Sequence, residues 1–293
     1  MGVIEFPKKK KKSIVLTKQM LKVIRGTLHV HPNSPLVVWS GRSRLGKTTT
    51  AQELVKEIDL IYNPENPDAF RSLHYEVGEI TPDGGNEQKR GIRSLYHACI
   101  GRLDEGLYRT LPNEDLAKQL VHGLRRKNIQ LILIDEAGTL SLDAIRGMVL
   151  VRDVAENEDW TLGLVFIGMD DLPAKMCAVP QIQERIHDWF YFEEYALEEL
   201  FEVLRQINTH FAKLDLDYSH DRELVEFVHD KFGGLPGTVI PFLTKLNHRL
   251  DRLRERNGGI NVPLSLRILG TVYERTQRSM EKSLHASRRH IYK

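Results

Sequence analysis

The segment that most constrains the fold runs from Val37 to Val55 and reads VVWSGRSRLGKTTTAQELV. A short β-branched apolar run, LVVWS, stops at a glycine, which is typical of a buried strand. The residues after the glycine-flanked turn, KTTTAQELVKEIDLIY, have a helical pattern. The segment therefore predicts a strand, a tight turn and a helix in direct succession.

Strand patterns alternate with helical patterns through the first two thirds of the chain. We expect five strands within residues 36–40, 71–80, 129–138, 161–169 and 188–195, and a further helix before the first strand. Such alternation predicts an α/β domain with a parallel sheet covered by helices on both faces. From Ala196 onward the strand patterns stop and four helical patterns follow, which predicts a helical lid domain.

The composition is that of a soluble globular protein, with 293 residues, 41% apolar and 28% charged. No stretch approaches the roughly 18–20 uncharged apolar residues of a membrane helix, so no membrane association is expected. Only Cys99 and Cys177 are present, which excludes a disulfide framework and fits a reducing cytoplasm. Both cysteines are expected in the core.

Two basic segments flank an acidic body. Residues 1–12 carry five lysines against one glutamate, and residues 275–293 carry six Lys and Arg against one glutamate. Since the whole chain has a net charge of +2, the body between them is negative. Basic arms favour a polyanionic partner, although solvated tails would have the same composition.

The turn matches the phosphate-loop pattern G-x-x-x-x-G-K-[ST] at Gly41, Gly46, Lys47 and Thr48. In such a turn, backbone N–H groups and a helix N-terminus favour a polyphosphate. Lys47 would reach the β- and γ-phosphates and Thr48 would ligate Mg²⁺. The alternative is a glycine-rich turn with an incidental lysine. The candidate nucleotide-binding residues are Gly41, Arg42, Ser43, Arg44, Leu45, Gly46, Lys47, Thr48 and Thr49.

A second candidate site lies in LILIDEAG, where Asp135 and Glu136 end the most apolar predicted strand. Asp135 would hold Mg²⁺, and Glu136 would orient the attacking water as the catalytic carboxylate. A pair of carboxylates capping the next helix is the alternative. His74 and His97 are expected to be structural residues.

These motifs together resemble an AAA+ ATPase. The segments GRSRLGKTT, LILIDEAG, LVFIGMDDLP and QIQERIHDWFYFEEY occur in that order before the helical lid, and the narrower resemblance is to the DNA-transposition regulators of the MuB, TnsC and TniB group. It covers roughly residues 14–260. The resemblance implies a P-loop AAA+ fold, in which a five-stranded parallel sheet between helices precedes a small helical lid. It also implies ATP with Mg²⁺ as cofactors.

The resemblance implies that Arg185 is an arginine finger, which reaches the γ-phosphate held by the next subunit. The chain would then act as a homo-oligomer. A surface ion pair with Glu184 or Asp188 is the alternative. The sequence departs from the family at Met169, in the sensor-1 position, where Asp170 could substitute. It also departs at GGLPGTVIPFL, which lacks the sensor-2 arginine.

In the transposition group the segment after the second strand tracks DNA, and here it contains Lys89, Arg90 and Arg93. An exposed helix start with ordinary charges is the alternative. The basic stripe in KLNHRLDRLRER fits the solvated side of an amphipathic lid helix, and a DNA-facing role is left open.

The predicted division is a basic tail over residues 1–13, the nucleotide-binding domain over 14–195, the lid over 196–274 and a second basic tail over 275–293. The leading hypothesis is an ATP-hydrolysing regulator that oligomerises on double-stranded DNA, as a ring or helical filament, and recruits or activates a transposase together with target-selection proteins. The alternatives are a replication-initiator or secretion-type AAA+ ATPase and a weakly hydrolysing ATP-binding scaffold.

Overall fold

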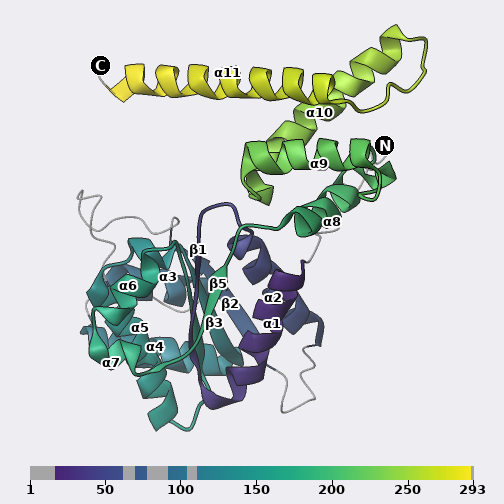
Figure 1. Cartoon of the computed structure of the whole chain (residues 1–293). Helices are drawn as coiled ribbons and strands as arrows, with labels where there is room; N and C mark the ends of the chain where they lie inside the picture. Colours follow the sequence, from purple (N-terminus) through teal and green to yellow (C-terminus); the bar gives the residue numbers. More distant parts are fainter. Residues whose placement is uncertain (1–16, 62–69, 78–91, 104–110, 292–293) are drawn as a thin grey trace, which may run out of the picture. The chain divides into compact units, whose positions relative to one another are not determined.

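The computed structural model describes residues 17–61, 70–77, 92–103 and 111–291, and the chain divides into two compact units (Figure 1). The α/β unit comprises Gln19–Tyr195 together with Leu235–Ile240. The helical unit includes Ala196–Gly234 and the chain from Pro241 onward. The second unit is therefore interrupted by a short segment that packs with the first.

A five-stranded parallel sheet forms the centre of the α/β unit, as the sequence predicts, with strand order β2-β3-β4-β1-β5. β1 has every residue buried, whereas burial alternates along β5 because this strand lies at the edge of the sheet. The strands are β1 (Leu36–Gly41), β2 (Arg71–Glu76), β3 (Ile129–Asp135), β4 (Gly163–Ile167) and β5 (Ile186–Phe192).

Helices cover both faces of this sheet. Figure 1 shows α3, α4 and α5 on one face and α1 and α2 on the other. The predicted sheet between helices is therefore confirmed. The helices of this unit are α1 (Lys18–Val30), α2 (Lys47–Ile61), α3 (Ile92–Arg102), α4 (Asn113–Arg126), α5 (Leu142–Asn157), α6 (Leu172–Cys177) and α7 (Pro180–Gln183), with 3₁₀ turns η1 (His31–Asn33) and η4 (Ala137–Thr139).

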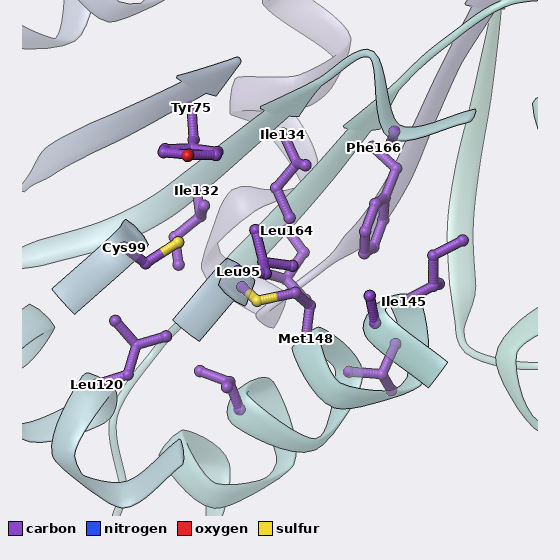
Figure 2. Close-up of a cluster of buried hydrophobic side chains, with 14 of the residues drawn as sticks. Tyr75, Leu95, Cys99, Leu120, Ile132, Ile134, Ile145, Met148, Leu164 and Phe166 are labelled. Carbon is purple, nitrogen blue, oxygen red and sulfur yellow. The ribbon is translucent and has the colours of Figure 1, made fainter. Parts of the chain in front are cut away.

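The largest cluster of buried apolar side chains fills the space between the sheet and α3, α4 and α5. Figure 2 shows Ile132 and Ile134 of β3 and Leu164 and Phe166 of β4 facing side chains from all three helices. At about 25 cal/mol per Å² of apolar surface, such burial is the main stabilising contribution to this unit. This apolar cluster holds β3 and β4 in place, and the carboxyl ends of these two strands carry candidate site residues.

The helical unit contains α8 (Leu197–Ile207), α9 (Ser219–Phe232), α11 (Leu266–Ile291), the greater part of α10 (Pro236–Arg256) and the 3₁₀ turn η5 (Phe211–Lys213). Phe232 of α9 contacts the rings of Phe242 in α10 and Tyr273 in α11, with centroid distances of 5.0 and 5.6 Å. α11 includes most of residues 275–293. The predicted domain boundaries stay predictions, and residues 1–13 lie outside the described ranges.

None of the helices in the described ranges combines the length and hydropathy needed to cross a bilayer. Of the two cysteines, Cys99 is fully buried in the core of the α/β unit, as expected. Cys177, at the end of α6, is exposed, so the expectation that both cysteines are core residues is wrong for this one. A six-residue helix presents only one side to the core, and Leu172 and Met176 occupy it.

Candidate nucleotide-binding site

The predicted phosphate loop connects the end of β1 to the start of α2 at the carboxyl edge of the sheet. Gly41, Arg44 and Gly46 have φ values of 144°, 69° and 93°, a region in which glycine carries no steric penalty. At Gly41 a Cβ atom would also lie 2.5 Å from the carbonyl oxygen of Phe192 in β5. The first glycine of the loop is therefore required by close strand packing as well as by its φ.

Lys47, the first residue of α2, is almost completely buried beneath the loop. Its Nζ donates hydrogen bonds to the carbonyl oxygens of Gly41 at 2.6 Å and Arg42 at 2.7 Å. Burial lowers the pKa of Lys47, and the nearby carboxylates of Asp135 and Asp170 oppose that shift. The ammonium group is thus held against the loop with two carboxylates in its electrostatic environment.

Asp135 ends β3 with only 3% of its surface exposed. Its Oδ1 accepts a hydrogen bond from the backbone N–H of Glu136 at 2.9 Å, while its Oδ2 has no hydrogen-bond partner among the described residues. Burial alone would raise the pKa of Asp135, but polar contacts with His74 and Thr48 and the backbone hydrogen bond lower it overall. The carboxylate is therefore ionised, and it has one oxygen available for a ligand.

Glu136 follows with its backbone in the left-handed region, at φ 58° and ψ 29°, and its side chain exposed. A helix-capping role for the two carboxylates is the alternative that the sequence leaves open. In the structure Ser141 caps α5, since its Oγ accepts a hydrogen bond from the N–H of Ala144 at 3.1 Å, and Glu136 makes no side-chain cap at η4. The exposed carboxylate of Glu136 is thus available for another role.

The segment after β4 places Asp170, and not Met169, in the electrostatic environment of Lys47. The hydroxyl of Tyr191 in β5 donates a hydrogen bond to Oδ1 of Asp170 at 3.2 Å. The side chain of Met169 is 55% exposed. Asp170, rather than Met169, is therefore the polar residue that follows β4 near Lys47.

The start of α10 lies directly against the phosphate loop. The N–H of Gly237 donates a hydrogen bond to the carbonyl oxygen of Arg44 at 3.1 Å, and a Cβ atom at Gly237 would lie 2.8 Å from Cβ of Arg44. Both residues belong to the α/β unit. The sequence GGLPG thus brings a backbone, rather than an arginine side chain, to the loop.

The other loop residues have differing environments. Leu45 is buried, Ser43 and Arg44 are exposed, and Thr48 and Thr49 are half-buried. The guanidinium of Arg42 is ion-paired with Glu194, just after β5. Arg42 and Arg44 are not required by the phosphate-loop pattern, and Arg42 is bonded within its own chain.

Arg185 lies immediately before β5, at the opposite edge of the sheet from the phosphate loop. Ile186 pairs with Leu36 at the start of β1, whereas Phe192 pairs with Gly41 at its end. The guanidinium of Arg185 is ion-paired with Asp153 of α5, on the surface. An ion pair was the alternative interpretation of this residue, with Glu184 or Asp188 as partner, and the partner observed is instead Asp153.

Of the three candidate DNA contacts, only Arg93 lies within the described residues; Lys89 and Arg90 do not. Arg93 is in the first turn of α3, and its Nη2 donates a hydrogen bond to the carbonyl oxygen of Leu111 at 2.7 Å. The guanidinium is therefore partly engaged within the α/β unit.

This arrangement defines a P-loop nucleotide-binding domain of the AAA+ type, with the glycine turn and the acidic strand end at one edge of a five-stranded parallel sheet. Residues 32–176 match the family model described as AAA domain, which agrees with this fold. No curated protein matches the sequence.

Solved structures of similar fold include two origin-recognition proteins of Aeropyrum pernix. The ORC2 protein in its ADPNP–ADP complexes has a TM-score of 0.61 and 16% identity, over 92% of this chain and 70% of that chain. The ORC1 protein in complex with DNA has a TM-score of 0.57 and 14% identity, over 92% and 68%. A Thermotoga maritima RuvB variant has a TM-score of 0.54 and 12% identity, over 87% of this chain and 67% of that chain. At these identities the similarity shows the fold.

Two residues that contact the predicted site were not singled out for it by the sequence. His74, expected to be structural, lies with Nε2 3.7 Å from Oδ2 of Asp135, and both atoms are buried without a hydrogen-bond partner among the described residues. Gly237 touches the phosphate loop from a distant part of the chain. His74 pairs with Leu133 in the β2–β3 register, which brings it near Asp135, and no local sequence pattern contains that register.

Proposed function

We propose that this protein is an ATP-dependent AAA+ ATPase that assembles on double-stranded DNA and regulates a transposase. The nucleotide part rests on Gly41–Thr48, whose loop N–H groups and buried lysine are suited to a polyphosphate. The chemistry of the donor set fits Mg²⁺, because this ion prefers a carboxylate and a hydroxyl together with phosphate oxygens. Asp135, with its unpartnered Oδ2, and Thr48 would hold it.

Within this site each side chain has a separate task. Lys47 would exchange its hydrogen bonds to the loop carbonyls for bonds to the β- and γ-phosphates. Glu136, exposed at the end of β3, would orient the attacking water and accept its proton. Bound Mg²⁺ would neutralise charge that develops on the phosphate oxygens. His74 would keep the carboxylate of Asp135 ionised and oriented.

The observation that carries the assembly part is the position of Arg185. The length of β1 and β5, about 17 Å at 3.3 Å per residue, separates Arg185 from its own phosphate loop. A role at a γ-phosphate thus requires a second copy of the chain. ATP would then stabilise the subunit interface, and hydrolysis would weaken it, since only the γ-phosphate contacts differ.

Substituting Arg185 and its ion-pair partner by alanine in separate variants tests this role. We expect Arg185→Ala to lower DNA-stimulated ATP turnover by about 10³-fold or more while leaving nucleotide affinity unchanged. Asp153→Ala is the matched control, since it breaks the same ion pair but keeps the guanidinium. Equal loss of turnover in both variants would identify Arg185 as a local structural residue and refute the proposal.

Assembly on DNA is tested by electron microscopy of the protein with random-sequence duplex DNA. We expect rings or filaments with ATP, fewer with ADP, and stable assemblies with Glu136→Gln, which would bind ATP without hydrolysing it. Assembly that is the same with ATP and ADP would contradict the proposal. DNA contacts by Lys89, Arg90 and Arg93 are part of it, although Arg93 also serves the fold.

The likeness of motif order to transposition regulators supports the transposase as partner. The likeness in fold to the two Aeropyrum pernix origin-recognition proteins favours a second candidate, a replication-initiator ATPase. Isolation of the protein from its host with ATP and DNA, followed by mass spectrometry of attached proteins, separates the two. A recombinase is expected, and a replicative helicase in its place would favour the second candidate.

A further inference from the structure

The helical unit contains a basic pocket of about 360 Å³ between α10 and α11. Five of its six lining side chains are Lys, Arg or His, and none is acidic. They are Lys245, His248, Arg249 and Arg252 of α10 and Val272 and Arg275 of α11. All six residues belong to the helical unit, so the pocket is complete within that unit.

The helical period explains how the cations come together. Lys245, His248, Arg249 and Arg252 stand at i, i+3, i+4 and i+7, which is one face of α10. Arg275 adds a further positive charge from α11, three residues after the buried Val272. The stripe that the sequence presented as the solvated side of an amphipathic helix thus lines one side of a concave site.

These cations lack the carboxylate partners that other arginines of the same unit have. Arg205 pairs with Glu202, Arg222 with Glu226, and Arg278 with Glu274. Within the described part of the chain, the five basic residues of the pocket form no ion pair or side-chain hydrogen bond. Like charges on neighbouring turns of a helix are destabilising, and an anionic occupant would reverse that effect.

We propose that this pocket binds consecutive phosphate groups of the backbone of double-stranded DNA. The proposal rests on the DNA-binding part of the proposed function and adds a contact surface outside the AAA domain. Lys245 and Arg252 are about 10 Å apart along α10 at 1.5 Å per residue. Neighbouring phosphates of one DNA strand are separated by about 3.4 Å of rise along the duplex axis and by more through space, so this face can engage two consecutive phosphates. Such contacts carry affinity and no sequence information.

The test is the salt dependence of duplex binding by the full chain, measured by fluorescence anisotropy with two unrelated random-sequence duplexes. We expect Arg249→Ala/Arg252→Ala to reduce the slope of log affinity against log salt by about 1.8, at about 0.9 per phosphate contact, and to weaken binding at least about tenfold near 0.15 M salt. The loss should be equal for both duplexes. Arg249→Lys/Arg252→Lys keeps the charges and should keep the slope.

Arg267→Ala is the matched control, because it removes an exposed cation of α11 that does not line the pocket. If the Ala double variant binds the duplexes with an unchanged slope of log affinity against log salt, this proposal is overturned and the proposed function stays intact. Absence of duplex binding by the unchanged chain overturns the DNA part of both. Polyglutamate is tested in the same way. If it binds the unchanged chain but not the Ala double variant, and if both proteins bind DNA equally, the pocket is assigned to an acidic protein instead.

Discussion

At the scale of single residues, the site combines groups that the fold holds in unfavourable states. Glu136 has a left-handed backbone, and Lys47 is an ammonium group buried beneath a loop. For residues with a Cβ the left-handed region costs about 1–2 kcal/mol. The strained residue is the one at which the proposed chemistry needs an exposed carboxylate next to a buried one, and backbone strain is common at such functional sites.

Two substitutions of Glu136 separate strain from chemistry. Glu136→Gly and Glu136→Ala both remove the carboxylate, so we expect ATP turnover to be lost in both. Only glycine relieves the left-handed backbone, and Glu136→Gly should therefore exceed Glu136→Ala in free energy of unfolding by about 1 kcal/mol. Urea denaturation of the two variants measures the difference. Equal stability would show that the conformation at φ 58° is not strained.

His31 makes the stability of the α/β unit depend on pH. Its ring stacks on Phe70 at a centroid distance of 3.9 Å, and its Nε2 lies 3.1 Å from the carbonyl oxygen of Gln130. Burial lowers the pKa of His31 below its ordinary value of 6.5, while that carbonyl opposes the shift. The folded state thus binds the proton less readily than the unfolded state does.

Because the folded-state pKa is lowered, the contribution of neutral His31 to stability is full above pH 6.5 and is lost as the pH falls toward the folded pKa. We expect the unfolding free energy of the unchanged chain to decline over that range. The decline should be shallower in His31→Gln, which cannot titrate. Chemical denaturation at a series of pH values gives both curves, and identical slopes would contradict the role of this residue.

At the scale of elements, the sequence was sufficient to predict those strands, turns and helices that local residue patterns specify. The apolar run before Gly41 and the helical pattern after Lys47 specified the strand, turn and helix, and the apolar strand ending at Asp135 specified the acidic strand end. Neither pattern contains the register between strands. The approach of His74 to Asp135 and of Gly237 to Arg44 depends on pairing and packing between distant segments, so sequence periodicity does not show them.

The contact between α10 and the phosphate loop is tested by adding one methyl group. Gly237→Ala places a Cβ 2.8 Å from Cβ of Arg44, so the helix start or the loop must shift. We expect a loss of about 1–3 kcal/mol in stability and weaker nucleotide binding. Gly101→Ala is the matched control in helix α3 of the same unit, because its Cβ meets nothing within 4 Å. Calorimetry with and without ATP measures both effects, and equal behaviour of the two variants would exclude a tight contact.

At the scale of the whole molecule, charge and burial are unevenly distributed. The basic pocket lies in the helical unit, whereas the ionised Asp135 and the other candidate nucleotide residues lie in the α/β unit. Burial raises the pKa of the Cys99 thiol to about 12, while Cys177 is exposed. The two cysteines therefore report on different states of the chain.

Thiol labelling converts this difference into a measurement of unfolding. We expect a thiol reagent at neutral pH to modify Cys177 within minutes in the native protein and Cys99 only on the timescale of unfolding, because the thiolate is the reactive form. Mass spectrometry of labelled peptides distinguishes the two sites. ATP should slow the labelling of Cys99 further, since a ligand that binds only the native state stabilises it. Rapid native labelling of Cys99 would show that the core between the sheet and α3 opens readily.

The position of β1 in the sheet also determines how late in synthesis on the ribosome the sheet can form. β1 pairs with β4 and β5, and its residue Leu36 is matched with Leu164 and Ile186. At about 5–20 residues per second, the roughly 130 positions up to β4 take some 6–25 s to synthesise. Until then the apolar strand before the phosphate loop lacks both neighbours, and it is open to chaperones or to aggregation. The nucleotide site can therefore form only after the sheet has received its last strands.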